Sequence, residues 1–377
     1  MLLFAWLAGC ATVAPAPWHK GDVYLWKEGR RLDQAELARR LERARLVLVG
    51  ETHHHPGHHQ VQLQVLRLMA AGNPAPVVGV EWLPAGAQPA CDRLSAGEIT
   101  VREFARLVDW KHTWGYPLTL YAPILEEVRR RHLKLVALNA PTAVVRQVAH
   151  RGLKSLGPNQ RAQLAPALDL EDPPYRRLMA QQFKSHGGMG GLREEDFFIA
   201  QVARDETMAH HMARALEPWP DGGRRGLVLV GSGHLTYRLG LPPRLARRLP
   251  GADPLVILPV GIDLAGELEN ESRPPADILV FTDPTPPRPR GRPRLGLVLQ
   301  PVKEGLRVQW VFPGYPAHKA GVQAGDLLVE LDGHPLKRVK DIHRSLRDAP
   351  YAAHSYVILR KGRRLELKIR LDRPSGP

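Results

Sequence analysis

Cysteine is nearly absent from this chain: 377 residues contain only Cys10 and Cys91, too few for a disulfide framework. Acidic residues are also scarce, because 38 Asp and Glu stand against 53 Lys and Arg, which gives a formal net charge of +15. The basic residues are scattered, and the chain has no zinc-finger, RRM or KH signature. We therefore predict no nucleic-acid partner and interpret the charge as an arginine-rich, solvated surface.

Long apolar runs are missing beyond the N-terminus, so no later segment is predicted to cross a membrane. The first ten residues, MLLFAWLAGC, end in a box that resembles the cleavage site of bacterial lipoproteins. Acyl chains on Cys10 would anchor the protein to a bilayer. We predict a lipoprotein signal at 1–10, a tether at 11–20 and a location in the cell envelope. Ala11 favours the outer membrane, if the organism has one.

Apolar runs alternate with amphipathic stretches between residues 21 and 282. The amphipathic stretches predict helices at 58–71, 122–132 and 196–219. The apolar runs predict buried strands at 46–50, 76–82, 133–141, 226–234, 254–261 and 277–282. This alternation indicates an α/β domain with a mostly parallel central sheet and helices on both faces.

A proline-rich segment, DPTPPRPRGRP at 283–293, predicts an extended linker. The composition changes beyond it, and short strand-like runs indicate a separate β-rich module at 294–373. Within this module, GYPAHKAGVQAGDLLVELDGHPL resembles the PDZ-domain pattern. Gly321 and Gly325 fit turn positions, and Asp332-Gly333 fits a hairpin turn.

The PDZ resemblance implies a binding groove for the C-terminus of a peptide or protein. The backbone at Leu295, Gly296 and Leu297 would take the terminal carboxylate. The peptide would then add as an extra strand between the strand that starts at Leu297 and the helix predicted in VKDIHRSLRDA.

One phrase, L-V-L-V-G-x-x-H, occurs twice, at 46–53 and at 227–234. In each copy a glycine lets the chain turn sharply where a buried strand ends. Because ligands bind beyond the carboxyl ends of parallel strands, we expect both histidines at one edge of the sheet, and we infer two related halves. Two imidazoles and two carboxylates there could bind a metal or exchange protons. The expected group is Glu51, His53, Glu81 and His234.

Several stretches, in this order, resemble the ChaN family of haem-binding bacterial lipoproteins: VGETHHHPGHHQVQLQVL, GVEW, WGYPLTLYAPILEEVRRRHLKLVALNAP, IAQVARDETMAHHMA and VGSGHLTYRLGLP. That family is similar to the Tiki-type metalloproteases and the erythromycin esterases. The resemblance covers roughly residues 20 to 282. It implies that Glu51, His53, Glu81 and His234 line the family pocket. It also implies haem held between the two subunits of a homodimer, with tyrosine and histidine near the iron.

The haem contacts that we expect combine two tyrosines with three histidines. Tyr116 and Tyr121 lie in the aromatic-rich segment HTWGYPLTLYAPI, and tyrosinate is one of the axial ligands of haem iron. His58 lies near the predicted start of a helix, where the dipole lowers the pKa of an imidazole and favours its neutral form. His53 and His234 complete this predicted haem-binding set.

Three functions remain open at this stage. The first is a haem- or iron-binding surface lipoprotein, used in iron acquisition. The second is a metal-dependent hydrolase or peptidase, in which His53, Glu81 and His234 hold a divalent ion and a glutamate activates water. The third is a scaffold that acts through the PDZ module. No nucleophile elbow and no H-E-x-x-H motif is present. We place the haem-binding protein first because the resemblance covers the whole domain.

Overall fold

The structure is a computed structural model that describes residues 18–185, 192–217, 223–269, 273–284, 295–311, 315–346, 349 and 351–371. The chain forms two compact units, the first mainly from residues up to Pro286 and the second mainly from Pro287 to Pro377. Each unit is described by itself. Cys10, where we predict lipidation, and most of the predicted linker lie outside the described residues.

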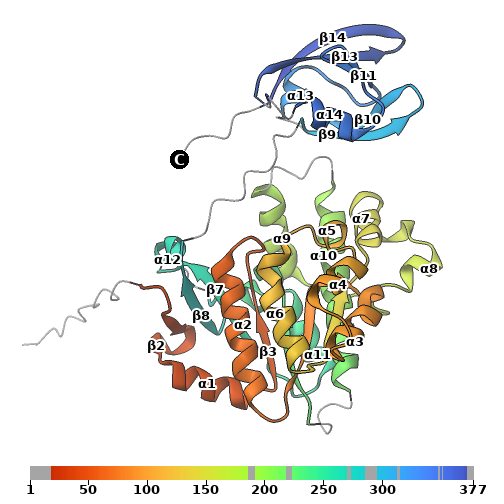
Figure 1. The fold of residues 1–377 in the computed structure, drawn as a ribbon. Coiled ribbons are helices and arrows are strands. Elements are labelled where there is room, and N and C mark those ends of the chain that lie inside the picture. Colours follow the sequence, from red (N-terminus) through yellow and green to blue (C-terminus); the bar gives the residue numbers. More distant parts are fainter. Residues whose placement is uncertain are drawn as a thin grey trace, which may run out of the picture. The chain divides into compact units, whose positions relative to one another are not determined.

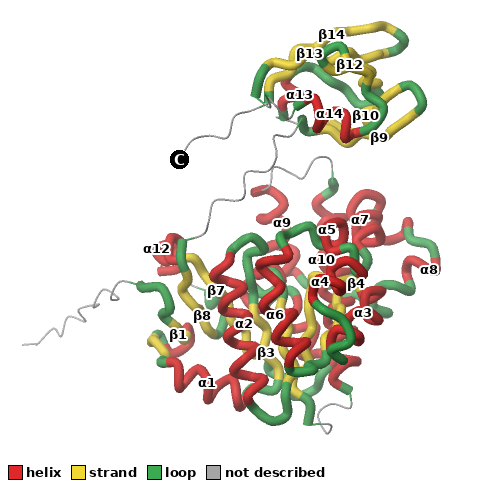
Figure 2. Tube along the Cα trace, in the orientation of Figure 1, coloured by secondary structure: helices red, strands yellow, loops and turns green. Residues whose placement is uncertain are grey.

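A mostly parallel sheet forms the centre of the first unit, which confirms the predicted fold class (Figure 2). In the described part of the chain its strand order is β2-β1-β8-β7-β3-β6-β4-β5. Strands β3 to β8 pair in parallel, and β1 joins β2 and β8 in antiparallel fashion. The strands are β1 Val23–Leu25, β2 Arg30–Leu32, β3 Leu46–Val49, β4 Pro76–Pro84, β5 Leu135–Asn139, β6 Arg225–Leu229, β7 Leu255–Gly261 and β8 Ile278–Thr282.

Helices cover both faces of this sheet (Figure 1). They are α1 Gln34–Arg43, α2 Pro56–Ala71, α3 Gln88–Ser95, α4 Val101–Leu107, α5 Trp110–Thr113, α6 Leu118–Arg130, α7 Thr142–Arg151, α8 Pro158–Arg161, α9 Pro173–Ser185, α10 Glu194–Leu216, α11 Leu241–Arg248 and α12 Ala265–Glu269. One core joins α1, α2 and α6 to the sheet, and the other joins α10 and α11 to its opposite face. None of the described helices is both long and apolar enough to span a bilayer.

The two copies of the repeated phrase form neighbouring strands, β3 and β6. Leu46 pairs with Gly226, so the strands align at an offset of 180 positions (226 − 46). The sequence repeat has an offset of 181 (227 − 46). Equivalent residues of the two copies are therefore one position out of register, and side chains one position apart in a strand point to opposite faces of the sheet.

The second unit is an antiparallel sheet, and its described residues also form two short helices. In the described residues the strand order is β14-β13-β11-β10-β9, with β12 paired to β11. Gly321 and Gly325 have φ of +85° and +91°, as their predicted turn positions require. The elements are β9 Leu297–Val302, β10 Gly305–Val311, α13 Pro316–Lys319, β11 Leu327–Leu331, β12 His334–Pro335, α14 Val339–Ser345, β13 Ala353–Arg360 and β14 Arg363–Arg370.

Candidate functional site

The carboxyl ends of β3, β4 and β6 bring the four predicted pocket residues together. Nδ1 of His53 lies 2.6 Å from Oε1 of Glu51, and Nε2 of His234 lies 3.3 Å from Oε1 of Glu81. Gly231 separates the two pairs: a Cβ there would lie 2.9 Å from Cε1 of His53 and 3.3 Å from Oε2 of Glu81. The site is this closely packed only because residue 231 has no side chain.

His53 forms the accessible side of the site. Its side chain keeps 30% of its surface exposed, whereas Glu51 beside it is buried. Its ring lies 4.8 Å, between centroids, from both Trp114 and Tyr116. Burial works against the charged ring, but the hydrogen bond and the charge of Glu51 raise its pKa above the usual value. His53 is thus a carboxylate-paired base within an aromatic wall.

His234 forms the buried side and is held as a cation. Its Nδ1 donates to Oδ1 of Asp205 at 2.5 Å, and the hydroxyl of Tyr175 donates to the other oxygen of that carboxylate at 2.6 Å. Burial opposes the charge of His234, but the charges of Asp205 and Glu81 outweigh it and raise the pKa of His234 to about 9.

Both carboxylate oxygens of Glu81 accept hydrogen bonds. Arg204 donates to Oε1, and the backbone N–H of Gly231 donates to Oε2 at 2.6 Å. Burial raises the pKa of Glu81, but His234 and Arg204 bring it well below its usual value.

The predicted metal site on His53, Glu81 and His234 is therefore not formed. Among the residues that the structure describes, no group of three or more His, Cys, Asp or Glu side chains is arranged to hold a metal ion. The physical reason is that Arg204 supplies a guanidinium where the ion would sit, and that both ring nitrogens of His234 face carboxylates and carry protons.

Helix α10 supplies the functional residues that the sequence interpretation missed. Arg204 and Asp205 reach into the pocket, while Glu206 and Thr207 fasten the helix elsewhere. The one available signal was R-D-E-T inside an amphipathic helix. Because consecutive positions of a helix point in different directions, four polar residues in a row cannot all face solvent. The sequence does not reveal which partners they have.

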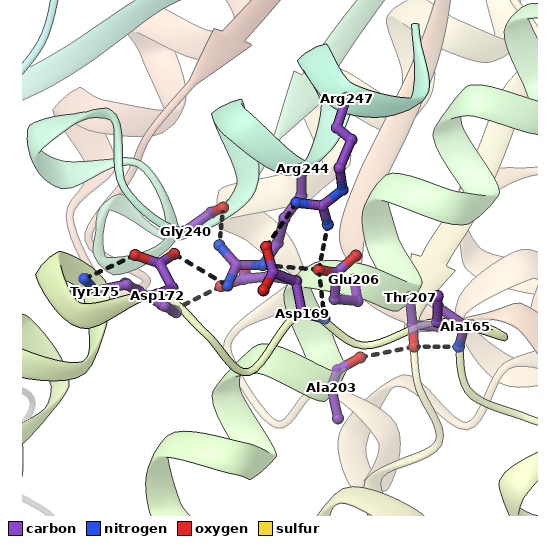
Figure 3. Close-up of polar contacts among 12 residues, drawn as sticks. Ala165, Asp169, Asp172, Tyr175, Ala203, Glu206, Thr207, Gly240, Arg244 and Arg247 are labelled. Atoms are coloured by element: carbon purple, nitrogen blue, oxygen red, sulfur yellow. Dashed lines mark hydrogen bonds and ion pairs between the residues drawn. The ribbon is translucent and has the colours of Figure 1, made fainter.

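Glu206 is the buried centre of an ion cluster (Figure 3). Arg247 donates to its Oε1 at 2.5 Å, and Arg248 lies 2.5 Å from Oε2. Arg244, which is 1% exposed, connects this carboxylate to Asp172. The cluster ties α10 to α11 and to the segment before α9, and so fixes the part of α10 that carries Arg204 and Asp205.

The histidine-rich segment after His53 is buried rather than open. His58 accepts the backbone N–H of Thr52 on Nδ1, so its proton lies on Nε2. Its ring stacks on His55 with centroids 3.8 Å apart. Burial, more than any helix dipole, lowers the pKa of His58 to about 3. His58 is thus enclosed in this structure, with its Nε2 buried and bonded to none of the described residues, and its contact with haem stays a prediction.

The two predicted tyrosines occupy different environments. Tyr121 is fully buried in α6, and its hydroxyl donates to the carbonyl of His53 at 3.1 Å. Burial also raises the pKa of Tyr121 above its usual value. Tyr116 lies in the loop before α6, is only partly buried and faces His53. Of the pair, Tyr116 alone is placed to meet a ligand.

A cleft of about 580 Å³ opens beside Tyr116. This volume is within the range of small-molecule and cofactor sites. Two of its residues, Arg106 and Lys111, are cationic, while the carboxylate of Asp109 is paired with His112 at 2.8 Å. The cleft is lined by Ala105, Arg106, Asp109, Trp110, Lys111, Gly115, Tyr116, Pro117 and Leu118.

In the second unit, the predicted carboxylate-binding backbone lies at the start of β9. Gly296 has φ +79°, and a Cβ there would lie 2.1 Å from Cβ of Tyr315, so only glycine fits. The carbonyl of Leu295 accepts the N–H of Ala317 at 3.0 Å. In the described residues Leu297 and the rest of β9 pair only with β10, which leaves one edge open for an added strand.

Two comparisons with curated proteins cover short parts of the chain. It is 28% identical over 156 residues to Protein RETICULATA-RELATED 5, chloroplastic, of Arabidopsis thaliana, across 37% of this chain and 20% of that protein. It is 36% identical over 72 residues to the periplasmic pH-dependent serine endoprotease DegQ of Escherichia coli (strain K12), across 19% of this chain and 16% of that protein. The chain thus spans a fifth or less of these relatives.

A solved structure resembles the first unit as a whole. ChaN of Campylobacter jejuni, described with cofacial haem binding, superposes with a TM-score of 0.52 at 15% identity, covering 69% of this chain and 95% of that one. At this identity the likeness shows the fold alone.

Sequence profiles of two families match separate parts of the chain. The profile described as haem-binding uptake, Tiki superfamily, ChaN matches residues 37–245, and a PDZ-domain profile matches residues 307–360. The chain belongs to the ChaN family of haem-binding uptake proteins in the Tiki superfamily, and it carries a PDZ domain at its C-terminal end.

Proposed function

We propose that this protein is a cell-envelope lipoprotein of iron acquisition that binds haem in the cleft beside Tyr116. The observation that carries the proposal is the coincidence of a large cleft, an accessible tyrosine and a histidine at one edge of a ChaN-family domain. The buried pocket around His234 is a less suitable place, because its polar groups already bond to one another.

The residues of the cleft fit the chemistry of haem. Trp110, Pro117 and Leu118 offer apolar contact to a flat porphyrin. Arg106 and Lys111 can pair with the propionates. Tyr116 would supply an oxygen ligand to the iron, and the imidazole of His53 lies against its ring. Bound haem would supply the iron that the protein carries, and the protein's part is to hold and orient it.

Hemin titration of the purified protein tests this assignment. We expect a saturable Soret shift, and we expect Tyr116→Phe to weaken binding at least about tenfold, the loss of one good contact, or to change the ligand-sensitive bands. Tyr121→Phe is the matched control, because its hydroxyl is buried and bonds to His53 backbone. Equal spectra and affinities for wild type and Tyr116→Phe would contradict the assignment.

We further propose that two copies close over haem as a homodimer. Leu107 of α4 is 50% exposed beside Arg106, which itself lines the cleft, so the rim offers apolar surface to a second copy. Light scattering with and without hemin tests this: mass should double when hemin is added. A monomer at saturating hemin would contradict it.

The membrane anchor remains a proposal from the LAGC box. Mass spectrometry of the native protein should show a lipidated N-terminal peptide that begins at Cys10. An unmodified peptide that runs through Cys10 would contradict both the anchor and the envelope location.

For the PDZ domain we propose that β9 binds the C-terminus of a peptide or protein. In a haem-binding protein this domain would recruit a partner protein. In a scaffold, peptide binding would be the main activity. Peptides with a free carboxylate should bind better than their C-terminal amides. Gly296→Ala should abolish binding, because its Cβ meets Tyr315. Gly362→Ala is the matched control, since Gly362 also has φ +79° but faces open space. Similar losses in both variants would contradict the role of β9.

A second candidate function is a hydrolase that works without a metal. It is favoured by one observation: Glu51 holds Nδ1 of the partly exposed His53, which leaves Nε2 available as a general base. Release of nitrophenol from p-nitrophenyl esters, lost in His53→Ala and kept in Tyr116→Phe, would support it. No turnover above that of His53→Ala would exclude this candidate.

A further inference from the structure

A second cavity, distinct from the cleft at Tyr116, lies at the carboxyl ends of β4 and β5. Its volume is about 240 Å³. It is lined by Trp82, Pro84, Thr113, Trp114, Asn139, Ala140, Thr142, Val145 and Arg204. Nothing in the haem proposal uses it. It is too small for haem, but an engineered cavity of about 150 Å³ in another protein holds benzene, so a single ring with a substituent fits.

Several hydrogen-bond donors of this cavity have no acceptor among the described residues, and two of them are the buried indole N–H groups of Trp82 and Trp114. The indole N–H of Trp82 is buried, in a side chain that is 1% exposed, and bonds to none of the described residues. Arg204 places Nη2 on Glu81 and Nε on Asn139 at 3.4 Å. Its Nη1 bonds to none of the described groups. A buried donor without an acceptor costs about 1–3 kcal/mol, so the two indole donors indicate a missing acceptor.

Two other polar groups of the wall already have partners. Asn139 donates its amide N–H to the carbonyl of Glu81 at 2.9 Å, and the hydroxyl of Thr113 donates to the carbonyl of Val108 at 2.6 Å. No carboxylate lines the cavity. The orphaned groups are donors, and the cavity has no carboxylate to balance a cation, so it favours a ligand that accepts hydrogen bonds.

The guanidinium is also held in place before any ligand arrives. Glu81 is buried and anchors Nη2, so Arg204 cannot swing away without leaving that charge unpaired. A guanidinium fixed in this way suits a carboxylate ligand, because the arginine side chain loses little conformational entropy when the ligand binds. Around it, Trp114, Pro84 and Val145 supply apolar walls for the rest of the ligand.

We propose that this cavity is a binding site for a small apolar or aromatic monocarboxylate, whose oxygens accept from Arg204 and Trp82 while its hydrocarbon part contacts Trp114 and Val145. The site is independent of the haem proposal: it shares no lining residue with the cleft at Tyr116.

Calorimetric titration of the full-length, haem-free protein with sodium benzoate tests the proposal, with benzyl alcohol as the neutral ligand of similar shape. We expect one benzoate site with a dissociation constant at or below about 1 mM, and benzyl alcohol at least about tenfold weaker, the worth of one charge-assisted hydrogen bond. Equal affinities would overturn the carboxylate assignment.

Two variants locate the site. Val145→Trp fills the cavity without touching the Arg204–Glu81 pair and should abolish benzoate binding, whereas Leu264→Trp adds the same side chain at a position that is 39% exposed and should not. Trp82→Phe removes the indole donor and keeps an aromatic ring, and it should weaken benzoate about tenfold. It also identifies the indole proton signal that should shift with benzoate in the NMR spectrum of wild type. Unchanged binding in Val145→Trp, or no shifted Trp82 signal, would overturn the proposal.

Discussion

The ends of β3 and β6 carry the same L-V-L-V-G-x-x-H phrase, yet their histidines have opposite surroundings. Because the strands pair one position out of register with the repeat, Val47 faces one core while its counterpart Val228 faces the other. His53 consequently meets the aromatic side chains on the face covered by α2 and α6. His234 instead meets α10 on the opposite face.

The comparison shows that a repeated sequence fixes where a residue lies on the sheet but not what it does there. The partners decide that. His53 has one carboxylate and partial exposure, which suits contact with a ligand. His234 has two carboxylates and is buried, which makes it part of the framework. The first prediction below targets the partner that creates this difference.

Asp205→Ala should have the largest effect. It removes the carboxylate that balances His234 and also accepts from Tyr175, and breaking a buried ion pair of this kind costs about 3–5 kcal/mol of unfolding free energy. Urea unfolding followed by tryptophan fluorescence measures the loss. Asp253→Ala is the control, because this carboxylate is 88% exposed where it pairs with Arg238 and should matter little. Similar stabilities of the two variants would mean that His234 does not depend on Asp205.

The next effect is a dependence of stability on pH that differs between His234 and His58. The pKa of His234 rises to about 9 in the folded protein, so its contribution is complete below about pH 6.5 and is lost as pH rises through 9. The pKa of His58 falls to about 3, so its contribution is complete above about pH 6.5 and is lost as pH falls toward 3.

Unfolding free energies of wild type, His234→Gln and His58→Gln, measured from pH 4.5 to 9.5, check this. The advantage of wild type over His234→Gln should shrink on the alkaline side. As pH falls, wild type should lose unfolding free energy because His58 becomes protonated on unfolding. His58→Gln should not show this loss. Parallel pH curves for all three proteins would show that neither ring changes its pKa on folding.

Much of the fold was predictable because buried parallel strands are continuous apolar runs. All six strands predicted in the first unit are present, and the three predicted helices correspond to α2, α6 and α10 with shifted ends, whereas the other helices of the unit were not predicted. The β1–β2 hairpin was not predicted, since its strands have three residues each and β2 contains Arg30 and Arg31 at the edge of the sheet. Such a segment has too little periodicity to be recognised.

The site was predictable in position but not in chemistry. The positions of Glu51, His53, Glu81 and His234 near the carboxyl ends of predicted parallel strands indicated that they lie together. The structure does bring them together. The metal expectation failed because Arg204 stands 123 positions from Glu81 in the sequence, and nothing local indicates that pairing. The carboxylates of such a His and Glu cluster need a positive charge nearby. The sequence pattern is the same whether a metal ion or a guanidinium supplies it.

His53→Gln should have the smallest effect on stability and the sharpest effect on function. A glutamine side chain can still donate to Glu51, so the unfolding free energy should change by no more than about 1 kcal/mol, the worth of one hydrogen bond. Beside Tyr116, however, an amide replaces the only imidazole that the described structure places against that ring, so the haem spectrum or the ester hydrolysis should change. The matched variant His234→Gln should show the reverse, with a large loss of stability and haem bands that stay as in wild type wherever the protein remains folded. If His53→Gln instead destabilised the protein as much as His234→Gln and left both activities intact, the two strand ends would be equivalent after all, and the division between a ligand-facing and a framework histidine would have to be abandoned.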